Sequence, residues 1–280
     1  MRLIIDAGST KTEWVVLDKG NVVDRFVLGG YNPNYNSDLT LIDLLYKDLP
    51  KDFPAMDEVY YYGTGCGSKA NQEMVAQYLR VFFEEAKVVR VTHDLMAVCH
   101  ALFQNEPGIA CILGTGSNSC LYDGKEVVDQ AVSLGYLVGD EGSGCTIGRK
   151  VVRAYFYDMM PAELKQAFTQ AYHLELKDFI HNVYHEPGAT KYLAGFCKFA
   201  GEHQDHPFMR QLVWDCFEDF IKVFVLRYDS CHDLPVSFVG SVAYHFRDLL
   251  RESLNEKGLS MGNVMQSPAE GLITYYQSAN

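Results

Sequence analysis

One pattern of strands and turns occurs twice in the chain and constrains its fold more than any other feature. The apolar residues 3–5 lead into Asp-Ala-Gly-Ser-Thr-Lys-Thr at 6–12, and the apolar residues 109–113 lead into Gly-Thr-Gly-Ser-Asn-Ser at 114–119. Each loop is followed by a strand, a charged glycine turn and a Val-Val-Asp strand, as in LDKGNVVD (17–24) and YDGKEVVD (122–129). Such self-similarity predicts two similar α/β halves, each beginning with a β-meander.

The two meanders place a predicted domain boundary near Pro107. We expect an N-terminal domain over residues 1–107 and a C-terminal domain with a helical insertion over 108–268. The closing helix, within 269–280, is a candidate to pack on the first domain. A chain of 280 residues is long for one hydrophobic core and short for three, which agrees with two domains.

Hydrophobic periodicity and turn residues predict the remaining elements. In the first domain we expect strands at 3–6, 13–18, 22–28, 58–62 and 87–92, and helices at 39–46, 69–83 and 93–103. Afterwards we expect strands at 109–113, 119–122, 127–132, 236–239 and 263–266, and helices at 143–158, 161–171, 189–200, 207–229, 242–254 and 269–277. The helical middle, 151–230, contains no metal or nucleotide motif, and its role is left open.

Charge and composition argue against several classes of function. The net charge of −12 disfavours a nucleic-acid partner, because binding to phosphates needs a basic face. The longest uncharged run, 107–122, is broken by Gly, Ser and Asn, so no membrane partner is expected. Eight scattered Cys without a CxxC pair predict reduced thiols. A strand directly after Met1-Arg2 leaves no room for a signal peptide, and we expect a cytoplasmic location.

Each of the two glycine loops could bind an anion. A glycine-rich turn exposes backbone N–H groups in a concave surface, and Ser and Thr hydroxyls add further donors. In the first loop Lys11 could contact a phosphate, and Asp6 would fit beside phosphates if it held Mg²⁺. The alternative is a tight hairpin turn in which Asp6 bonds local amides. Two such loops at matching places favour a polyphosphate that is held by one loop from each domain.

The familiar nucleotide signatures are missing. Gly63–Lys69 resembles a Walker A motif, but Ser68 separates Gly67 from Lys69 and breaks the required spacing. No GxGxxG follows a strand with the partner acid of a Rossmann site. We therefore interpret 63–67 as a loop that closes a strand.

Three further junctions have both a structural and a functional interpretation. Asp94 either caps the helix that follows it or acts as a general base, and spacing alone favours the cap. Asp140 lies in an acidic helix turn matched to the helix dipole, or binds sugar hydroxyls. Gly240 and Ser241 form a simple β-to-α turn, or a backbone surface that an adenosine can approach closely.

In this order, the stretches resemble the superfamily of sugar kinases, actin and heat-shock chaperone ATPases. More narrowly, they are similar to the N-acetylglucosamine kinase group of the BadF/BadG/BcrA/BcrD ATPase family. The resemblance extends from Asp6 to about Gly271, and its most specific motifs are GTGSN (114–118) and GDEGSG (139–144). It implies an α/β fold of two RNase H-like (actin-like ATPase) domains with a cleft between them, closing over ATP and a sugar. Relatives also suggest a homodimer.

The resemblance implies a role for individual residues by position. Asp6 would bind Mg²⁺, and Asp94 would be the catalytic base for the attacking hydroxyl, which reverses the preference for a helix cap. The residues implied to bind ATP are Asp6, Gly8, Ser9, Thr10, Lys11, Thr115, Gly116, Gly240 and Ser241. The residues implied to bind the sugar are Asn32, Asp94, Ser117, Asn118, Gly135 and Asp140.

The expected function is the ATP-dependent phosphorylation of a hydroxyl of an amino sugar, with N-acetylglucosamine as the leading acceptor. Ala7 and Ser9 stand where the family often has Gly, and the adenosine turn reads Gly-Ser rather than Gly-Gly. Leu134 stands where the mammalian N-acetylglucosamine kinases have Trp, so the identity of the sugar is open.

Two other classes remain as alternatives. One is an ATPase activator of the benzoyl-CoA reductase or 2-hydroxyacyl-CoA dehydratase type, which the dispersed Cys disfavour. The other is a non-catalytic sugar-binding relative, which the intact carboxylates of Asp6, Asp94 and Asp140 disfavour.

Overall fold

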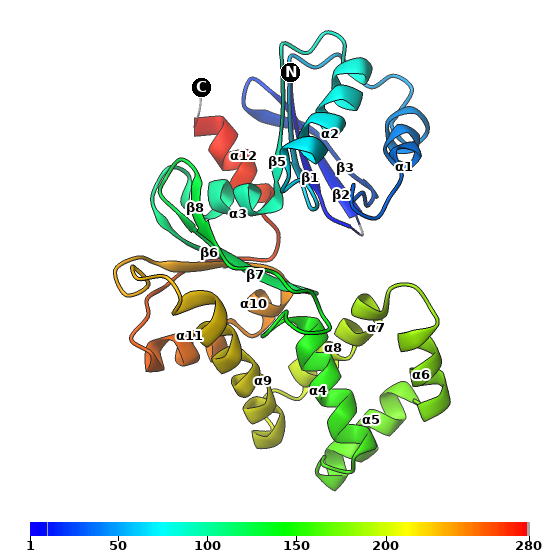
Figure 1. Ribbon diagram of the computed structural model, residues 1–280, viewed down its shortest axis with the longest axis vertical. Helices are drawn as coiled ribbons and strands as arrows, with labels where there is room; N and C mark the ends of the chain where they lie inside the picture. The colour runs from blue at the N-terminus through cyan, green and yellow to red at the C-terminus, as the bar shows by residue number, and fades with distance from the viewer. Residues whose placement is uncertain (10, 279–280) are drawn as a thin grey trace. The chain divides into compact units, whose positions relative to one another are not determined.

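The computed structural model describes residues 1–9 and 11–278, so the predicted phosphate ligand Thr10 lies outside the described residues. The chain divides into two compact units. The first comprises Met1–Asn105 with Pro268–Asn280, and the second Glu106–Ser267. Each unit contains one five-stranded mixed sheet covered by helices (Figure 1).

The sheet of the first unit has the strand order β3-β2-β1-β4-β5. The strands are β1 (Arg2–Ala7), β2 (Lys11–Asp18), β3 (Asn21–Gly29), β4 (Glu58–Gly63) and β5 (Val88–His93). β1, β2 and β3 form an antiparallel meander, and β4 and β5 run parallel to β1. Ala7 pairs with Gly63, and Gly63 pairs with His93, so the three parallel strands end at the same edge of the sheet.

The helices of the first unit are α1 (Asp38–Asp43), α2 (Lys69–Phe82), α3 (Asp94–Phe103) and α12 (Ala269–Ser278). A π-helical turn at Leu44–Asp48 follows α1. The last helix packs closely on α3, because a Cβ atom on Gly271 would lie 2.5 Å from the backbone oxygen of Ala101. The hydroxyl of Tyr62 joins both helices to β4, with hydrogen bonds of 2.8 Å to His100 Nδ1 and 2.6 Å to the hydroxyl of Tyr276.

The second unit repeats this strand topology with the order β10-β9-β6-β7-β8. Its strands are β6 (Gly108–Leu113), β7 (Ser117–Tyr122), β8 (Val127–Gln130), β9 (Val236–Val239) and β10 (Met261–Met265). β6, β7 and β8 form the antiparallel meander, and β9 and β10 are the added parallel strands. The first strand of each meander is central and apolar on both faces, as expected for a strand covered on both sides.

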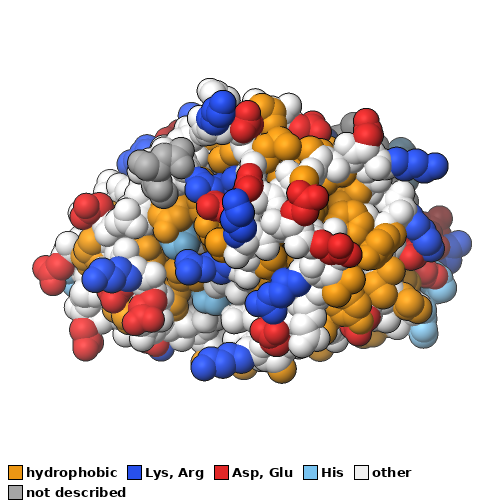
Figure 2. Space-filling model, turned by 90° about the horizontal axis from the view of Figure 1, so that it is seen from above, with side chains coloured by type: hydrophobic (Ala, Val, Ile, Leu, Met, Phe, Trp, Pro, Cys, Tyr) orange, Lys and Arg blue, Asp and Glu red, His pale blue; other side chains and the backbone are white. Residues whose placement is uncertain are grey.

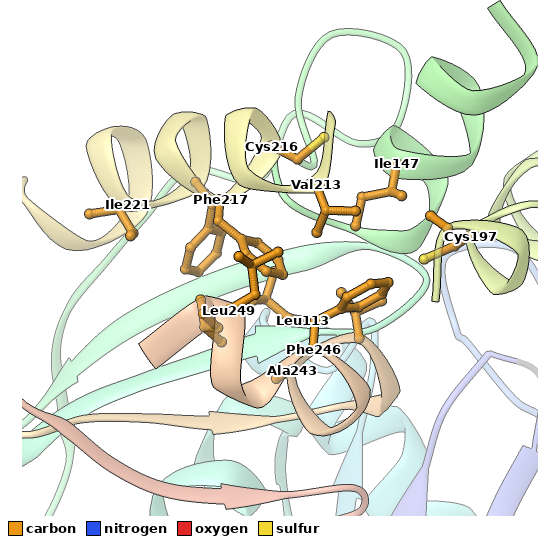
Figure 3. Close-up of a cluster of buried hydrophobic side chains, with 14 of the residues drawn as sticks. Leu113, Ile147, Cys197, Val213, Cys216, Phe217, Ile221, Ala243, Phe246 and Leu249 are labelled. Carbon is orange, nitrogen blue, oxygen red and sulfur yellow. The ribbon is translucent and has the colours of Figure 1, made fainter. Parts of the chain in front are cut away.

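Most of the helices of the second unit lie between β8 and β9. They are α4 (Gly144–Phe156), α5 (Ala162–Tyr172), α6 (Leu176–Tyr184), α7 (Ala189–Gly195), α8 (Cys197–Glu202) and α9 (Pro207–Phe220), with α10 (Ser241–His245) and α11 (Arg247–Glu256) after β9. Figure 3 shows part of the core that joins several of them: Phe217 of α9 points toward Leu113 of β6, and Ile147 of α4 lies beside Val213 of α9. Burial of each such side chain contributes about 1.5–3 kcal/mol to stability.

The thiols behave as small apolar groups. All eight cysteines are buried and none forms a disulfide, as the scattered spacing predicted. Within the described residues, no group of three or more His, Cys, Asp or Glu could hold a metal ion. No helix in residues 1–9 and 11–278 is long and apolar enough to cross a bilayer.

The structure corrects several predicted elements. α6 was not predicted, although its apolar residues Leu176, Phe179, Ile180 and Val183 recur at helical spacing; none of its residues is fully buried. The helices predicted at 189–200 and 242–254 are each two helices, with breaks at the buried Phe196 and Phe246. The helix predicted at 207–229 ends at Phe220 and continues only as a π-helical turn, Ile221–Val225. The strands are confirmed, although β8 ends at Gln130 rather than at 132.

Candidate active site

The loop after β1 is a tight turn that is joined to its neighbours by backbone hydrogen bonds. The N–H of Gly8 donates to the carbonyl of Lys11 at 2.9 Å, and the N–H of Tyr31 donates to the carbonyl of Gly8 at 3.2 Å. Ser9 and Lys11 are exposed. Both side chains are therefore accessible to a ligand, whereas the Gly8 amide is used by the turn itself.

Asp6 lies among other carboxylates. It pairs with Glu13 in the β1–β2 register, and Glu13 is only 7% exposed. Burial first, and then the charges of Glu13 and Asp94, raise the pKa of Asp6 to about 7, while Lys11 acts in the opposite direction. Arg25 Nε donates to Glu13 Oε1 at 2.7 Å and offsets part of this negative charge. The residues around Asp6 therefore disfavour an unpaired carboxylate and favour a bound cation.

This arrangement fits a Mg²⁺ ion that takes few ligands from the protein. Mg²⁺ is usually held by one or two carboxylates together with phosphate oxygens and waters. No group of three or more metal-ligating side chains occurs in the part of the chain that the structure describes. Asp6 could serve as the single carboxylate, and a cation there would offset the burial and the neighbouring negative charges that raise its pKa.

Asp94 is the first residue of α3 and does not cap it. The N-cap residue is His93, and Asp94 Oδ1 accepts a hydrogen bond of 2.9 Å from the N–H of Leu95. The helix cap that spacing favoured is therefore wrong, because the helix already begins at Asp94, directly after His93, the last residue of β5. Asp94 lies where the parallel strands of the first unit end, which is the usual edge for ligands in such sheets.

Asn32 is fixed next to the first glycine loop. Its Nδ2 donates to Ser9 Oγ at 3.2 Å, and its Oδ1 accepts from the N–H of Asn34 at 3.0 Å. Gly65 has a φ of +78°, and a Cβ atom there would lie 2.2 Å from Asn32 Oδ1. The predicted loop 63–67 is a turn from Thr64 to Gly67, because Gly63 still belongs to β4, and this turn closes over Asn32.

The second glycine loop rests on the start of α4. The N–H of Gly144 donates to the carbonyl of Gly114 at 2.8 Å, and the N–H of Cys145 donates to the carbonyl of Thr115 at 3.1 Å. Ser117 is 5% exposed, and its Oγ has no hydrogen-bond partner among the described residues. An unpartnered buried hydroxyl is rare, and it marks Ser117 as a candidate contact for a ligand. Its neighbour Asn118 is half-buried, and Asn118 Oδ1 accepts from the N–H of Ser119 at 2.9 Å.

Asp140 lies against this loop in a left-handed backbone conformation, with a φ of +57°. Its Oδ1 accepts a long hydrogen bond of 3.4 Å from the N–H of Ser117, and a Cβ atom on Gly116 would lie 3.0 Å from its Oδ2. Burial raises the pKa of Asp140, and the Ser117 N–H opposes that change. Strained, buried polar residues of this kind concentrate at functional sites.

The interpretation of Asp140 as part of an acidic helix turn is wrong. The first turn of α4 contains no acidic residue, and its N-cap is Ser143, whose side chain accepts from the N–H of Thr146. Gly135 lies in a separate turn that is closed by a hydrogen bond of 2.9 Å from the N–H of Gly139, and its φ is +70°. Leu134, beside it, is 62% exposed.

A cavity of about 740 Å³ lies inside the second unit. It is lined by Gly114 and Thr115 of the second glycine loop and by Ser241 and Val242 of the segment after β9. Gly240 has a φ of +131°, and a Cβ atom there would lie 2.2 Å from the backbone oxygen of Leu113. Only glycine allows the segment after β9 to approach the backbone of Leu113 so closely. As a result, two loops that were predicted to bind different parts of ATP line one cavity.

The remaining wall of the cavity was missed by sequence reasoning. It comes from α7, α8 and the segment around α10, with Lys191, Ala194, Gly195, Lys198, Glu202 and His245 among the lining residues. The only sequence signal is a pair of Ala-Gly dipeptides, at 194–195 and 200–201. A Cβ atom on Gly148 of α4 would lie 2.0 Å from the backbone oxygen of Leu193, so small residues allow these helices to pack closely.

The predicted site residues are divided between the two units. The first unit contains Asp6, Gly8, Ser9, Lys11, Asn32 and Asp94, and the second contains Thr115, Gly116, Ser117, Asn118, Gly135, Asp140, Gly240 and Ser241. Within each unit, the structure groups most of them around the loop that follows the first strand. This duplicated topology, with a glycine loop after each first strand, is that of the actin-like sugar kinases.

Comparisons with solved structures agree with this class. A ROK family glucokinase from Streptomyces griseus, in complex with glucose and AMPPNP, matches with a TM-score of 0.54 and 15% identity over 98% of this chain and 97% of that one. The protein named putative N-acetylglucosamine kinase from Chromobacterium violaceum matches with a TM-score of 0.71 and 17% identity over 98% of both chains. These two likenesses show the fold.

A third structure shows the family. The protein named putative N-acetylglucosamine kinase from Porphyromonas gingivalis matches with a TM-score of 0.94 and 40% identity over 99% of both chains. No protein-family model matches the sequence, and a search of curated proteins finds no match. The chain belongs to the N-acetylglucosamine kinase family of actin-like sugar kinases.

Proposed function

We propose that this protein is an ATP-dependent kinase that phosphorylates a hydroxyl of an amino sugar, with N-acetylglucosamine as the first candidate. The observation that carries the proposal is the cavity lined jointly by Gly114–Thr115 and Ser241–Val242. Its volume of about 740 Å³ lies within the range of about 300–1,000 Å³ that is usual for small-molecule sites. Membership of the family, at 40% identity to one member, supports the same activity.

The nucleotide would lie with its adenosine along Gly240 and Ser241 and its phosphates on the glycine loops. Lys191 and Lys198 place two cations at the cavity wall, where Glu202 pairs with Lys198 at 3.4 Å. Lys11 would meet the phosphates from the first unit. Mg²⁺ held by Asp6 would, when bound, neutralise charge on the transferring phosphoryl group.

The carboxylate of Asp94 would accept the proton of the attacking sugar hydroxyl. It has one hydrogen bond to its own helix end, and its second oxygen is not part of a helix cap. Asn32 would hold the sugar from the first unit, and Ser117, Asn118, Gly135 and Asp140 from the second. Fixed donors and acceptors of this kind orient one hydroxyl for in-line transfer.

An ADP-release assay over a panel of sugars tests the proposal. We expect ADP release that depends on N-acetylglucosamine, and weaker or no release with glucosamine, N-acetylmannosamine, N-acetylmuramic acid and glucose. ATP binding without release on any sugar would instead support a sugar-binding relative. Visible absorption of protein purified without oxygen would support the ATPase activator. Either result would contradict the proposed kinase activity.

Asp94→Asn tests the base. We expect turnover to fall by about 10²–10⁴-fold, as for loss of a general base, while ATP binding stays unchanged. Asp38→Asn is a matched control, because Asp38 is likewise the first residue of a helix, α1, in the same unit. If Asp94→Asn kept near-normal turnover, Asp94 would not be the base.

We also propose that the protein forms a homodimer and is located in the cytoplasm. Sedimentation at micromolar concentration tests the first, and fractionation of cells that express the tagged chain tests the second.

A further inference from the structure

The first sheet has a free edge at β5, next to α2 (Figure 1). The N–H of Val88 donates to the carbonyl of Asp57, at 3.3 Å, on the side of β4. Backbone groups alternate sides along a strand, so those of Val89 and Val91 point away from β4. No strand of residues 1–9 and 11–278 pairs with β5 on that side. The edge therefore presents a row of backbone donors and acceptors to a further strand.

A groove of about 670 Å³ runs along this edge. One wall consists of four consecutive β5 residues, Val88–Val91, preceded by Lys87. The other wall is one face of α2, with residues at helical spacings of three and four: Lys69, Gln72, Glu73, Ala76 and Arg80. A chain added beside β5 would therefore lie between the strand edge and the helix.

The groove has the opposite charge to the whole molecule. Lys69, Arg80, Lys87 and Arg90 line it against the single acid Glu73, while the chain as a whole has a net charge of −12. Arg80 pairs with Glu73 at 2.9 Å, and Lys87 pairs with Asp57 at 3.4 Å. Lys69 and Arg90 are exposed and make no ion pair with a described residue.

On the face that Figure 2 draws, Lys and Arg side chains are mixed with Asp and Glu side chains. An anionic ligand therefore has a reason to bind at the cations of this groove on a chain that is acidic as a whole.

We propose that this groove binds an acidic peptide segment in extended conformation, which pairs with β5 as a sixth strand. The outward backbone groups of Val89 and Val91 would bond the peptide backbone, as in other complexes formed by strand addition. Every second side chain of the added strand would face α2, where Lys69 and Arg80 lie. A small anion could use the cations, but it would leave the row of backbone groups without partners.

Fluorescence anisotropy with a labelled octapeptide of four Glu-Val repeats tests the proposal on the full chain. We expect saturable binding at low salt, and at least tenfold weaker binding of a Lys-Val octapeptide. A Glu-Val peptide with N-methyl groups on every internal amide keeps the charge but has no free internal N–H on either edge to form the strand ladder, and it should also bind at least tenfold more weakly. Equal binding of the N-methylated peptide, or full competition by inorganic phosphate, would show a simple anion site and overturn the proposal.

Two variants locate the peptide. The double substitution Lys69→Glu with Arg90→Glu changes only exposed side chains, and it should weaken binding at least tenfold. Val89→Pro removes one outward N–H without removing a bond to β4, and it should have a similar effect. Circular dichroism and sugar-dependent ADP release check that each variant is folded. Unchanged peptide binding in the folded double variant would refute the proposal. A homodimer that the peptide dissociates would also refute it, because another copy of the chain would then occupy the edge.

Discussion

Asp6→Asn should stabilise the protein at alkaline pH in the absence of Mg²⁺ and nucleotide. Burial, Glu13 and Asp94 raise the pKa of Asp6 from its ordinary value of 3.8 to about 7. The folded protein thus binds this proton more tightly than the unfolded chain does. The free energy of unfolding therefore falls as the pH rises from 3.8 to about 7, and above that it shows no further loss from this group.

The size of the effect follows from the same pKa values. A rise from 3.8 to about 7 corresponds to at most about 4 kcal/mol at 1.36 kcal/mol per pH unit. Asp6 is not wholly shielded from water, so we expect about 1–3 kcal/mol at pH 8 and little difference near pH 4. An Asn side chain has similar size and no charge, and it removes this dependence on pH.

Urea denaturation of wild type and Asp6→Asn, at pH values from 4 to 8 in EDTA, measures the difference. The variant should become more stable relative to wild type as the pH rises, while its kinase activity is lost. Asp94→Asn is the matched control: it removes a smaller cause of the shift, so it should reduce the slope without abolishing it. A difference that is independent of pH would refute the reasoning, because it would mean that Asp6 is not protonated preferentially in the folded state.

Two further predictions concern glycines. Gly240→Ala should lower stability by roughly 1–3 kcal/mol and weaken ATP binding at least tenfold in calorimetry, because its Cβ atom would lie 2.2 Å from the backbone oxygen of Leu113. Gly258→Ala is the control, since Gly258 also has a positive φ (+69°) but open space around it. The Gly258→Ala variant should leave ATP binding unchanged. Equal effects of both substitutions would contradict the steric argument. Gly271→Ala should separate α12 from α3, because the Cβ atom would lie 2.5 Å from the carbonyl oxygen of Ala101, and proteolysis should then remove the last helix. Resistance to protease equal to that of wild type would show that the helices adjust.

The strands and glycine loops were predictable because their signals are local. Alternating and continuous apolar runs, interrupted by Gly, Asn and Asp, identify the β-meanders in both units, and the repetition of the pattern indicates the duplicated topology. The place of Asp6 near the end of a buried strand could likewise be inferred from neighbouring residues alone.

Helix boundaries were less predictable because burial decides them. The breaks at Phe196 and Phe246 allow large side chains to reach the core; Gly195 directly precedes the first break, whereas no Gly or Pro within five residues marks the second. The start of α3 at Asp94, one residue earlier than a cap at Asp94 requires, was likewise not predictable from the local sequence. The neighbouring His93 remains in β5 through pairing with Gly63, which is thirty positions away.

The sequence by itself determined two β-meanders, two glycine loops and a set of carboxylates, since each depends on residues close together in the chain. Only the tertiary structure decided that α7 and α8 wall the cavity, that Glu13 and Asp94 act on Asp6, and that cations from α2 line a free strand edge. The physical reason is that solvent exclusion, charge interactions and cavities depend on distances in space, and folding brings together residues that are far apart in sequence.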